Sequence, residues 1–132
     1  MITDLITHLQ TELIVTDGYA KVAHAWTTQP NDEISTADLP AALVFTGRDS
    51  SDESNADNRV DQRTNREVWI YTVCNTDDLD DLRQRLFDAA LGWQADGSWD
   101  ALQHERGEVR DISGHRIWWL DVFRTWRMNS QT

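Results

Sequence analysis

Residues 62–92, QRTNREVWIYTVCNTDDLDDLRQRLFDAALG, contain an alternating strand pattern followed by an amphipathic helix pattern. Successive side chains of a strand point to opposite faces of a sheet. One face of this strand carries Val68, Ile70, Thr72 and Cys74, and the other carries Trp69, Tyr71 and Val73. Because residues 63–67 are polar on both faces, we expect the start of the strand to project beyond the body of the domain.

The helix is expected over residues 77–91, where Leu79, Leu82 and Leu86 form an apolar stripe. Its first turn is rich in carboxylates, which the helix dipole favours, and Gly92 suits its end. These carboxylates are Asp77, Asp78, Asp80 and Asp81. They have no partner at a metal-ligand spacing, so we interpret them as helix-capping residues rather than a metal site.

The flanking sequence supplies another helix and more strands. We expect a helix over residues 3–16, strands near 41–47, 63–74, 104–110 and 115–127, a short strand between residues 19 and 26, a loop over 27–36 and a turn over 111–114. This order predicts an α+β fold with a mainly antiparallel, four- to five-stranded sheet flanked by two helices. At 132 residues the chain is expected to form one domain, residues 1–132.

Tryptophan is unusually frequent, with seven residues in the chain. Most are expected in the core, since each indole buries a large apolar area. Trp118 and Trp119 are neighbours in the last predicted strand, so they must point to opposite faces. The sheet therefore carries bulky apolar side chains on both faces. Either helices cover both faces or one face meets another subunit.

The stretch at residues 48–61, RDSSDESNADNRVD, is predicted to be a long acidic hairpin loop. It holds five carboxylates, and Val60 is its single large apolar residue, so it cannot fold by burying its own surface. Structureless loops of this length are usually functional or disordered. We expect this loop to order against a partner. The candidate interface residues are Arg48, Asp49, Asp52, Glu53, Asp57, Arg59, Arg63 and Arg66.

Composition excludes several functions. A net charge of −11 is opposite to the basic field that phosphate binding requires. The single cysteine, Cys74, allows no internal disulfide. No apolar run of membrane-spanning length occurs, and the acidic residues Asp4 and Glu12 argue against a signal peptide. The four histidines are scattered, and no nucleophile, phosphate-loop or metal motif is present. We expect neither enzymatic activity nor a metal or cofactor.

One family resemblance covers the chain in order and length. The chain resembles the tail terminator proteins of long-tailed bacteriophages, the minor tail protein U family, in five features that occur in the same order. These are the segment ADLPAALVFTG at residues 37–47, the acidic loop, the alternating strand, the aspartate- and leucine-rich helix and the final aromatic strand. The resemblance implies a virion structural protein, assembled in the host cytoplasm and placed at the head-proximal end of the tail. Such proteins form a hexameric ring that caps the tail tube, ends tube polymerisation and provides the attachment surface for the head or neck.

The resemblance also implies the partners. These are other copies of the chain, the tail tube protein and a head-completion or neck protein, with DNA passing through the lumen without specific binding and no membrane or cofactor involved. Two other functions remain open. One is another head–tail junction protein, and the other is an acidic inhibitor or nucleic-acid mimic that acts as a monomer or dimer.

Overall fold

The structure is a computed structural model that describes residues 1–14, 18–24, 36–52 and 60–131. Its helices are α1 (Ile2–Leu9), which continues into a π-helical turn (Gln10–Ile14), and α2 (Leu79–Ala90), which follows a 3-10 turn (Thr76–Asp78). Its strands are β1 (Lys21–His24), β2 (Ala41–Ser51), β3 (Val60–Asn75), β4 (Gln103–Ser113) and β5 (Arg116–Gln131).

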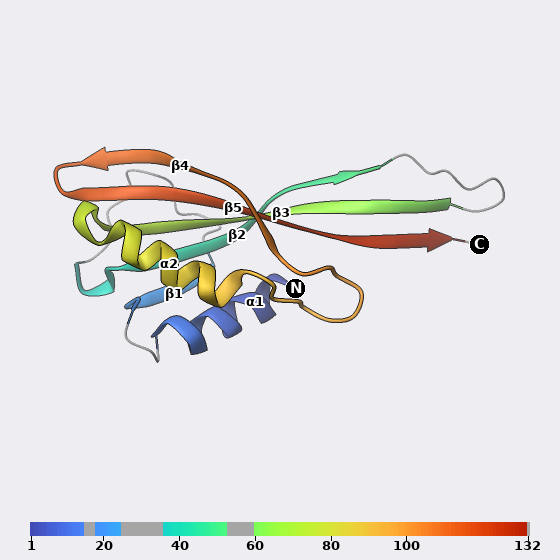
Figure 1. Cartoon of the computed structure of the whole chain (residues 1–132), viewed down its shortest axis with the longest axis horizontal. Helices are drawn as coiled ribbons and strands as arrows, with labels where there is room; N and C mark the ends of the chain where they lie inside the picture. Colours follow the sequence, from blue (N-terminus) through green and yellow to red (C-terminus); the bar gives the residue numbers. More distant parts are fainter. Residues whose placement is uncertain (15–17, 25–35, 53–59, 132) are drawn as a thin grey trace.

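The five strands form one sheet in the order β1-β2-β3-β5-β4. β1 runs parallel to β2, and the other neighbours are antiparallel. Figure 1 shows α1 and α2 beside the sheet and a long extension that carries the ends of β2, β3 and β5 away from the helices. The predicted α+β class, with a mainly antiparallel sheet and two helices, is confirmed.

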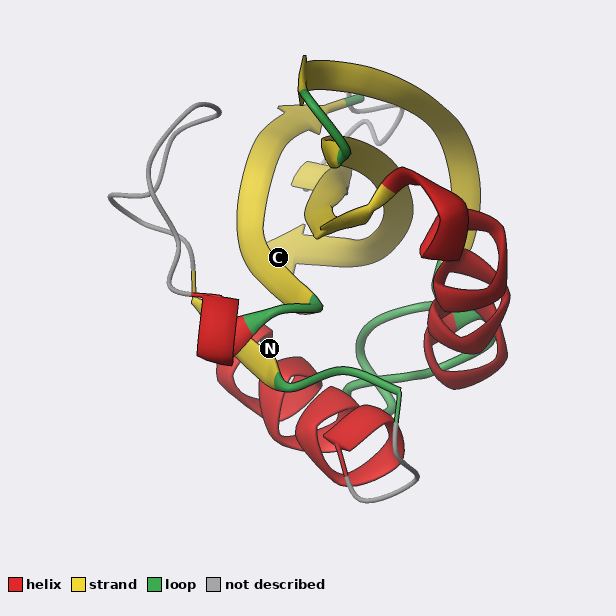
Figure 2. Ribbon diagram, turned by 90° about the vertical axis from the view of Figure 1, so that its left-hand side faces the viewer, coloured by secondary structure: helices red, strands yellow, loops and turns green. Residues whose placement is uncertain are grey.

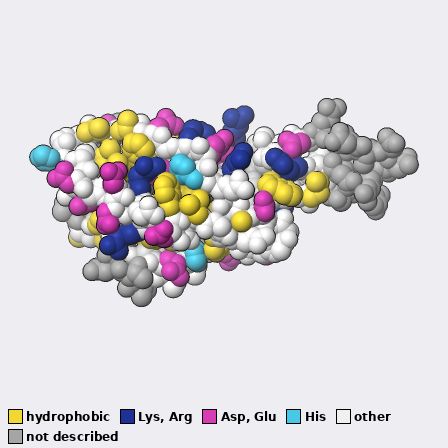
Figure 3. Space-filling model, viewed as in Figure 1, with side chains coloured by type: hydrophobic (Ala, Val, Ile, Leu, Met, Phe, Trp, Pro, Cys, Tyr) yellow, Lys and Arg dark blue, Asp and Glu magenta, His cyan; other side chains and the backbone are white. Residues whose placement is uncertain are grey.

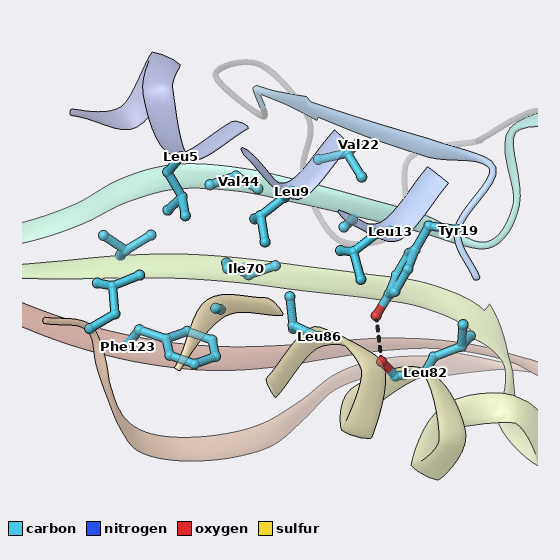
Figure 4. Close-up of a cluster of buried hydrophobic side chains, with 14 of the residues drawn as sticks. Leu5, Leu9, Leu13, Tyr19, Val22, Val44, Ile70, Leu82, Leu86 and Phe123 are labelled. Carbon is cyan, nitrogen blue, oxygen red and sulfur yellow. Dashed lines mark hydrogen bonds between the residues drawn. The ribbon is translucent and has the colours of Figure 1, made fainter. Parts of the chain in front are cut away.

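Both helices cover the same face of the sheet. Leu5, Leu9 and Leu13 pack with Leu82 and Leu86 over the strand residues Val44, Val68, Ile70 and Phe123, and all of these side chains are buried (Figure 4). The Tyr19 hydroxyl donates to the carbonyl of Leu82 at 3.1 Å, so the segment just before β1 is joined to α2 across this core. The sequence predicted this face correctly, because the apolar residues alternate along β3.

The opposite face has its own buried cluster, which contains Tyr71, Val73, Trp118, Leu120 and Val122. Neither α1 nor α2 contributes a side chain to this cluster; instead the sheet coils strongly around this side (Figure 2). The guanidinium of Arg110 on β4 lies 5.6 Å from the ring of Trp69 on β3, although β5 separates the two strands. The curvature of the sheet therefore encloses much of the second apolar face.

Three predicted boundaries were wrong. β2 does not end at Gly47 but passes through a bulge to Ser51, and a Cβ at Gly47 would lie 2.2 Å from the Trp69 ring, so this glycine provides space for the indole. Residues 48–51 and 60–61, predicted as loop, are strand residues: the first segment pairs with residues 64–67 of β3, and the second pairs with Ser130 and Gln131 of β5. β4 continues through residues 111–113, and the turn falls at Gly114, with φ +62°, and His115.

The remaining differences are small. The short strand predicted between residues 19 and 26 is β1, whereas most of the predicted loop at 27–36 lies outside the described residues. α1 and α2 occupy the expected positions, with ends shifted by a few residues.

Candidate functional site: a three-stranded arm and its base

The extension in Figure 1 is a three-stranded arm. We define the arm as residues 48–52, which are the end of β2 and Asp52, together with residues 60–67 of β3 and 124–131 of β5. Its ladder runs from the row Arg48–Glu67–Arg124 to the pair Val60–Gln131. Backbone pairing across three strands therefore supports a segment whose polar sequence cannot build a core of its own.

One face of the arm combines arginines with exposed apolar side chains. We call this the arm face and define it as Arg48, Arg63, Arg124, Trp126 and Met128, which the strand register places on one side of the sheet. The guanidinium of Arg63 lies 5.3 Å from the centre of the Trp126 ring. Trp126 and Met128 are 36% and 54% exposed, and because they are two residues apart on β5 they lie next to each other on this face.

At the base of the arm this face is hollowed. The hollow has a volume of about 340 Å³. Its charged lining residues are Arg48, Arg63, Arg66, Arg124, Glu67, Asp100 and Glu105. In Figure 3, Lys and Arg side chains are visible where the arm leaves the body. A hollow lined by both signs of charge is suited to polar contacts with another chain rather than to a small apolar ligand.

The other side of the arm is fixed to the body by Trp99, which is 5% exposed. The guanidinium groups of Arg66 and Arg127 lie 4.6 and 4.7 Å from the centre of its ring. The backbone N–H of Asp100 also donates to the carbonyl of Trp126 at 2.8 Å. The connection between α2 and β4 therefore anchors the arm, and the direction of the arm is set by stacking as well as by the ladder.

The interface residues predicted from the sequence are partly engaged within the chain. Arg66 makes two hydrogen bonds of 2.9 Å to the carboxylate of Asp49, and this guanidinium lowers the pKa of Asp49 below its usual value. Arg63 pairs with Asp52 at 3.2 Å. These pairs stabilise the arm itself. Arg48 is exposed and makes no ion pair among the described residues, and Glu53, Asp57 and Arg59 lie outside them.

Three members of the arm face were not predicted as interface residues: Arg124, Trp126 and Met128. The alternation of the last strand does place them on one side. What the sequence alone did not reveal is that β5 pairs with β3 along its whole length, from Arg116 to Gln131. That pairing brings the end of the chain onto the arm beside residues 60–67.

A second cluster of charged side chains lies under α2 around Asp121, whose side chain is fully buried. Arg83 donates two hydrogen bonds to its carboxylate, at 2.8 and 3.1 Å, and Nε2 of His104 lies 2.9 Å from it. The indole N–H of Trp119 donates at 3.2 Å. Every oxygen of the buried carboxylate is thus paired, and the cluster joins α2 to β4 and β5. We interpret it as a structural element.

Within the described part of the chain, no group of three or more His, Cys, Asp or Glu residues is arranged to hold a metal ion. None of the described helices is long and apolar enough to cross a bilayer. Burial raises the pKa of the Cys74 thiol to about 11, so this cysteine is neutral and inert in the folded chain.

Comparison with known proteins gives two findings. The family model described as "Phage tail terminator protein" matches residues 74–131, which run from the end of β3 through α2, β4 and β5. The resemblance noted in the sequence is thereby confirmed over this part of the chain. No curated protein matches the sequence.

Among solved structures, 24 chains match. One is a chain of a structure described as "Virion of native gene transfer agent (GTA) particle". It is 15% identical, the alignment covers 98% of this chain and 95% of that chain, and the TM-score is 0.59. At this identity the likeness concerns the fold, and it extends over nearly the whole chain, including the elements before residue 74.

Proposed function

We propose that the chain is a structural protein of a phage-like tail, a tail terminator. In this function it forms a closed ring on the end of the tail tube, stops further tube polymerisation and presents a surface for the head or neck protein. The observation that carries the proposal is the match of residues 74–131 to the tail terminator family. The fold shared with a chain of a gene transfer agent virion supports it.

The shape of the chain is consistent with a ring. A closed ring of identical subunits needs a heterologous interface, in which one surface of each subunit meets a different surface of the next. The arm projects at one end of the molecule and carries exposed apolar and charged side chains. The charged residues predicted for the interface, including Arg48, Arg63 and Arg66, belong to this arm or its base. In such a ring the function needs no catalytic group and no cofactor.

The acidity of the chain is compatible with this function. A lumen lined by a protein of net charge −11 repels DNA phosphates, so a genome can pass through the ring without adhering to it. In this proposal the ring assembles in the host cytoplasm and occupies the head-proximal end of the tail in the virion.

The purified chain provides the first test. Size-exclusion chromatography with light scattering, at several concentrations and at low and moderate salt, measures the mass of the assembly. We expect a ring-sized oligomer, hexameric by the family resemblance, that forms more readily at moderate salt because screening weakens the repulsion between acidic subunits. A chain that stays a monomer or dimer under all these conditions, with or without tube protein, would favour the acidic mimic instead.

A further inference from the structure

We propose that the arm face of one copy of the chain docks against the start of α2 and the neighbouring edge of β4 in the next copy. This inference rests on the proposed ring and assigns its subunit contact. We call the second surface the helix-start face and define it as Asp77, Asp78, Asp80, Val109 and Ile112. Four observations support the pairing: position, exposed apolar side chains, charge at the two surfaces and the distribution of net charge.

The two surfaces lie at opposite ends of the molecule. In Figure 1 the start of α2 and the turn between β4 and β5 lie at the left end, and the arm extends to the right. The backbone N–H of Thr76 donates to the carbonyl of His115 at 2.8 Å, which places the beginning of the helical segment against that turn. Surfaces at opposite ends permit a head-to-tail contact that is repeated from one subunit to the next.

The helix-start face combines the first turns of α2 with the strand edge beneath this helix. The guanidinium of Arg83 lies 4.6 Å from the centre of the Trp119 ring, and Trp119 pairs with Val109 across β5 and β4. Asp80 is one helical turn before Arg83, so it lies on the same side of α2 as the side chain that stacks on Trp119. Ile112 follows on the same face of β4, since it pairs with Ile117.

Both surfaces expose apolar side chains that the chain itself leaves uncovered. Six large hydrophobic residues are exposed among the described residues, and four of them fall on these two surfaces. Val109 and Ile112 are 47% and 57% exposed on the helix-start face, and Trp126 and Met128 belong to the arm face. Figure 3 shows hydrophobic side chains gathered at the end opposite the arm. Mutual burial of these side chains would supply the affinity of the contact.

The charges beside these apolar residues have opposite sign. Arg48 and Arg124 are exposed on the arm face and outnumber the carboxylate in their row, Glu67, which also lies 3.9 Å from a guanidinium nitrogen of Arg106. Asp77 and Asp80 are exposed on the helix-start face and make no ion pair among the described residues. Opposite charge at the rim of an apolar contact sets the register and rejects other pairings.

Net charge favours this pairing over contact between two bodies. In the described part of the arm, residues 48–52, 60–67 and 124–131, five arginines stand against four carboxylates, so the arm is close to neutral and the negative charge belongs to the rest of the chain. Two bodies therefore repel each other, whereas an arm with an arginine-rich face can approach an acidic body. A second copy of the same chain is the occupant that satisfies both surfaces at once.

Charge reversal on each surface tests the pairing. One variant carries R48E and R124E, a second carries D77R and D80R, and a third carries all four changes. The control, D4R with D88R, alters net charge as the second variant does but places the changes elsewhere on the helices. D77N with D80N is a milder version that perturbs the start of the helix less. Circular dichroism and thermal unfolding establish that each chain is folded before light scattering measures its assembly.

We expect the first two variants to need a concentration about tenfold or more higher for half-assembly, because each places like charges across the contact. The variant with all four changes should recover most of the assembly, and the control should assemble as the unchanged chain does. The inference is overturned if the single-surface variants assemble normally, or if combining them restores nothing while the unchanged chain forms rings. If the unchanged chain forms no ring under any condition, the proposed function itself fails.

Discussion

Asp121 illustrates how a single buried charge organises this fold. Its carboxylate accepts hydrogen bonds from Arg83 and Trp119 and contacts His104, and these side chains are packed together beneath α2. Gly107 on β4 pairs with Asp121 on β5 and leaves space for the cluster. A Cβ at that position would lie 2.7 Å from the carboxylate and 2.8 Å from the guanidinium of Arg83. The glycine is thus required by close packing.

Replacing Arg83 should be costly because it leaves Asp121 as a buried carboxylate without its main partner. We expect R83A to lower the free energy of unfolding by about 3 kcal/mol, the lower end of the range for breaking a buried ion pair, since Arg83 is itself partly exposed. R85A is the matched control on the same helix. It removes an exposed pair with Asp81 and should cost only ~0.5 kcal/mol. Equal losses in urea denaturation would contradict this interpretation.

Cys74 provides a prediction about pH. Burial raises the pKa of its thiol to about 11 in the folded chain, above the ~8.5 of an exposed cysteine. The unfolded state therefore loses this proton first as pH rises, and Cys74 contributes a decline in stability between ~8.5 and the folded value. A thiol reagent at pH 8 should label the native chain far more slowly than the chain in denaturant. Rapid labelling of native protein would show that the thiol is accessible.

At the scale of single elements, the sequence predicts most where one residue pattern decides the structure. The two faces of β3 and the apolar stripe of α2 follow directly from spacing, and both were predicted correctly. The end of β2 and the start of β3 were wrong because the missed residues, such as Asp49, Ser50 and Gln62, are polar and carry no alternation. They are held by cross-strand pairing, which depends on where β5 runs.

The pairing of distant elements also explains what was missed at the candidate site. Trp99 lies outside every helix and strand predicted from the sequence, yet it stacks with Arg66 and Arg127 from two strands. His104 and Asp121 are 17 residues apart and meet only because β4 and β5 pair. No local pattern indicates such contacts.

Two tryptophans near the arm should behave differently. W99A removes a buried side chain that anchors the connection before β4, and we expect a loss of about 3 kcal/mol or more in the free energy of unfolding. W126A changes an exposed residue of the arm face, so it should alter stability much less while weakening self-association. Chemical denaturation and light scattering on both variants separate the two roles. Loss of stability in W126A with unchanged assembly would contradict the proposed interface.

Deleting residues 50–60 tests the arm as an element. The deletion removes the end of the hairpin but leaves both buried clusters and the Trp99 contacts in place. We expect a folded monomer that no longer forms rings, because the deletion removes Ser50, Ser51 and Asp52, which hold residues 63–65 of the arm in place. Circular dichroism reports the fold, and light scattering reports the assembly. Normal rings from the shortened chain would show that this part of the hairpin is not needed for the contact.

For the whole molecule, the distribution of charge and the position of the arm favour the same mode of self-association. The body carries the negative charge, and the arm extends from it as a neutral, arginine-rich segment with exposed apolar residues. Such a chain repels copies of itself except through the arm, which favours ordered head-to-tail contact over general aggregation. In the proposed ring, the acidic bodies contribute the lumen and the surfaces presented to other tail proteins.

The central claim is that this chain ends the growth of a tail tube. Electron microscopy of tails assembled with its gene disrupted, with and without the intact gene supplied in trans, measures this most directly. Without the protein we expect tails of variable and often excessive length that do not join heads, and the intact gene should restore a uniform length and joined particles. Tails of normal, uniform length joined to heads in the absence of the protein would contradict the account.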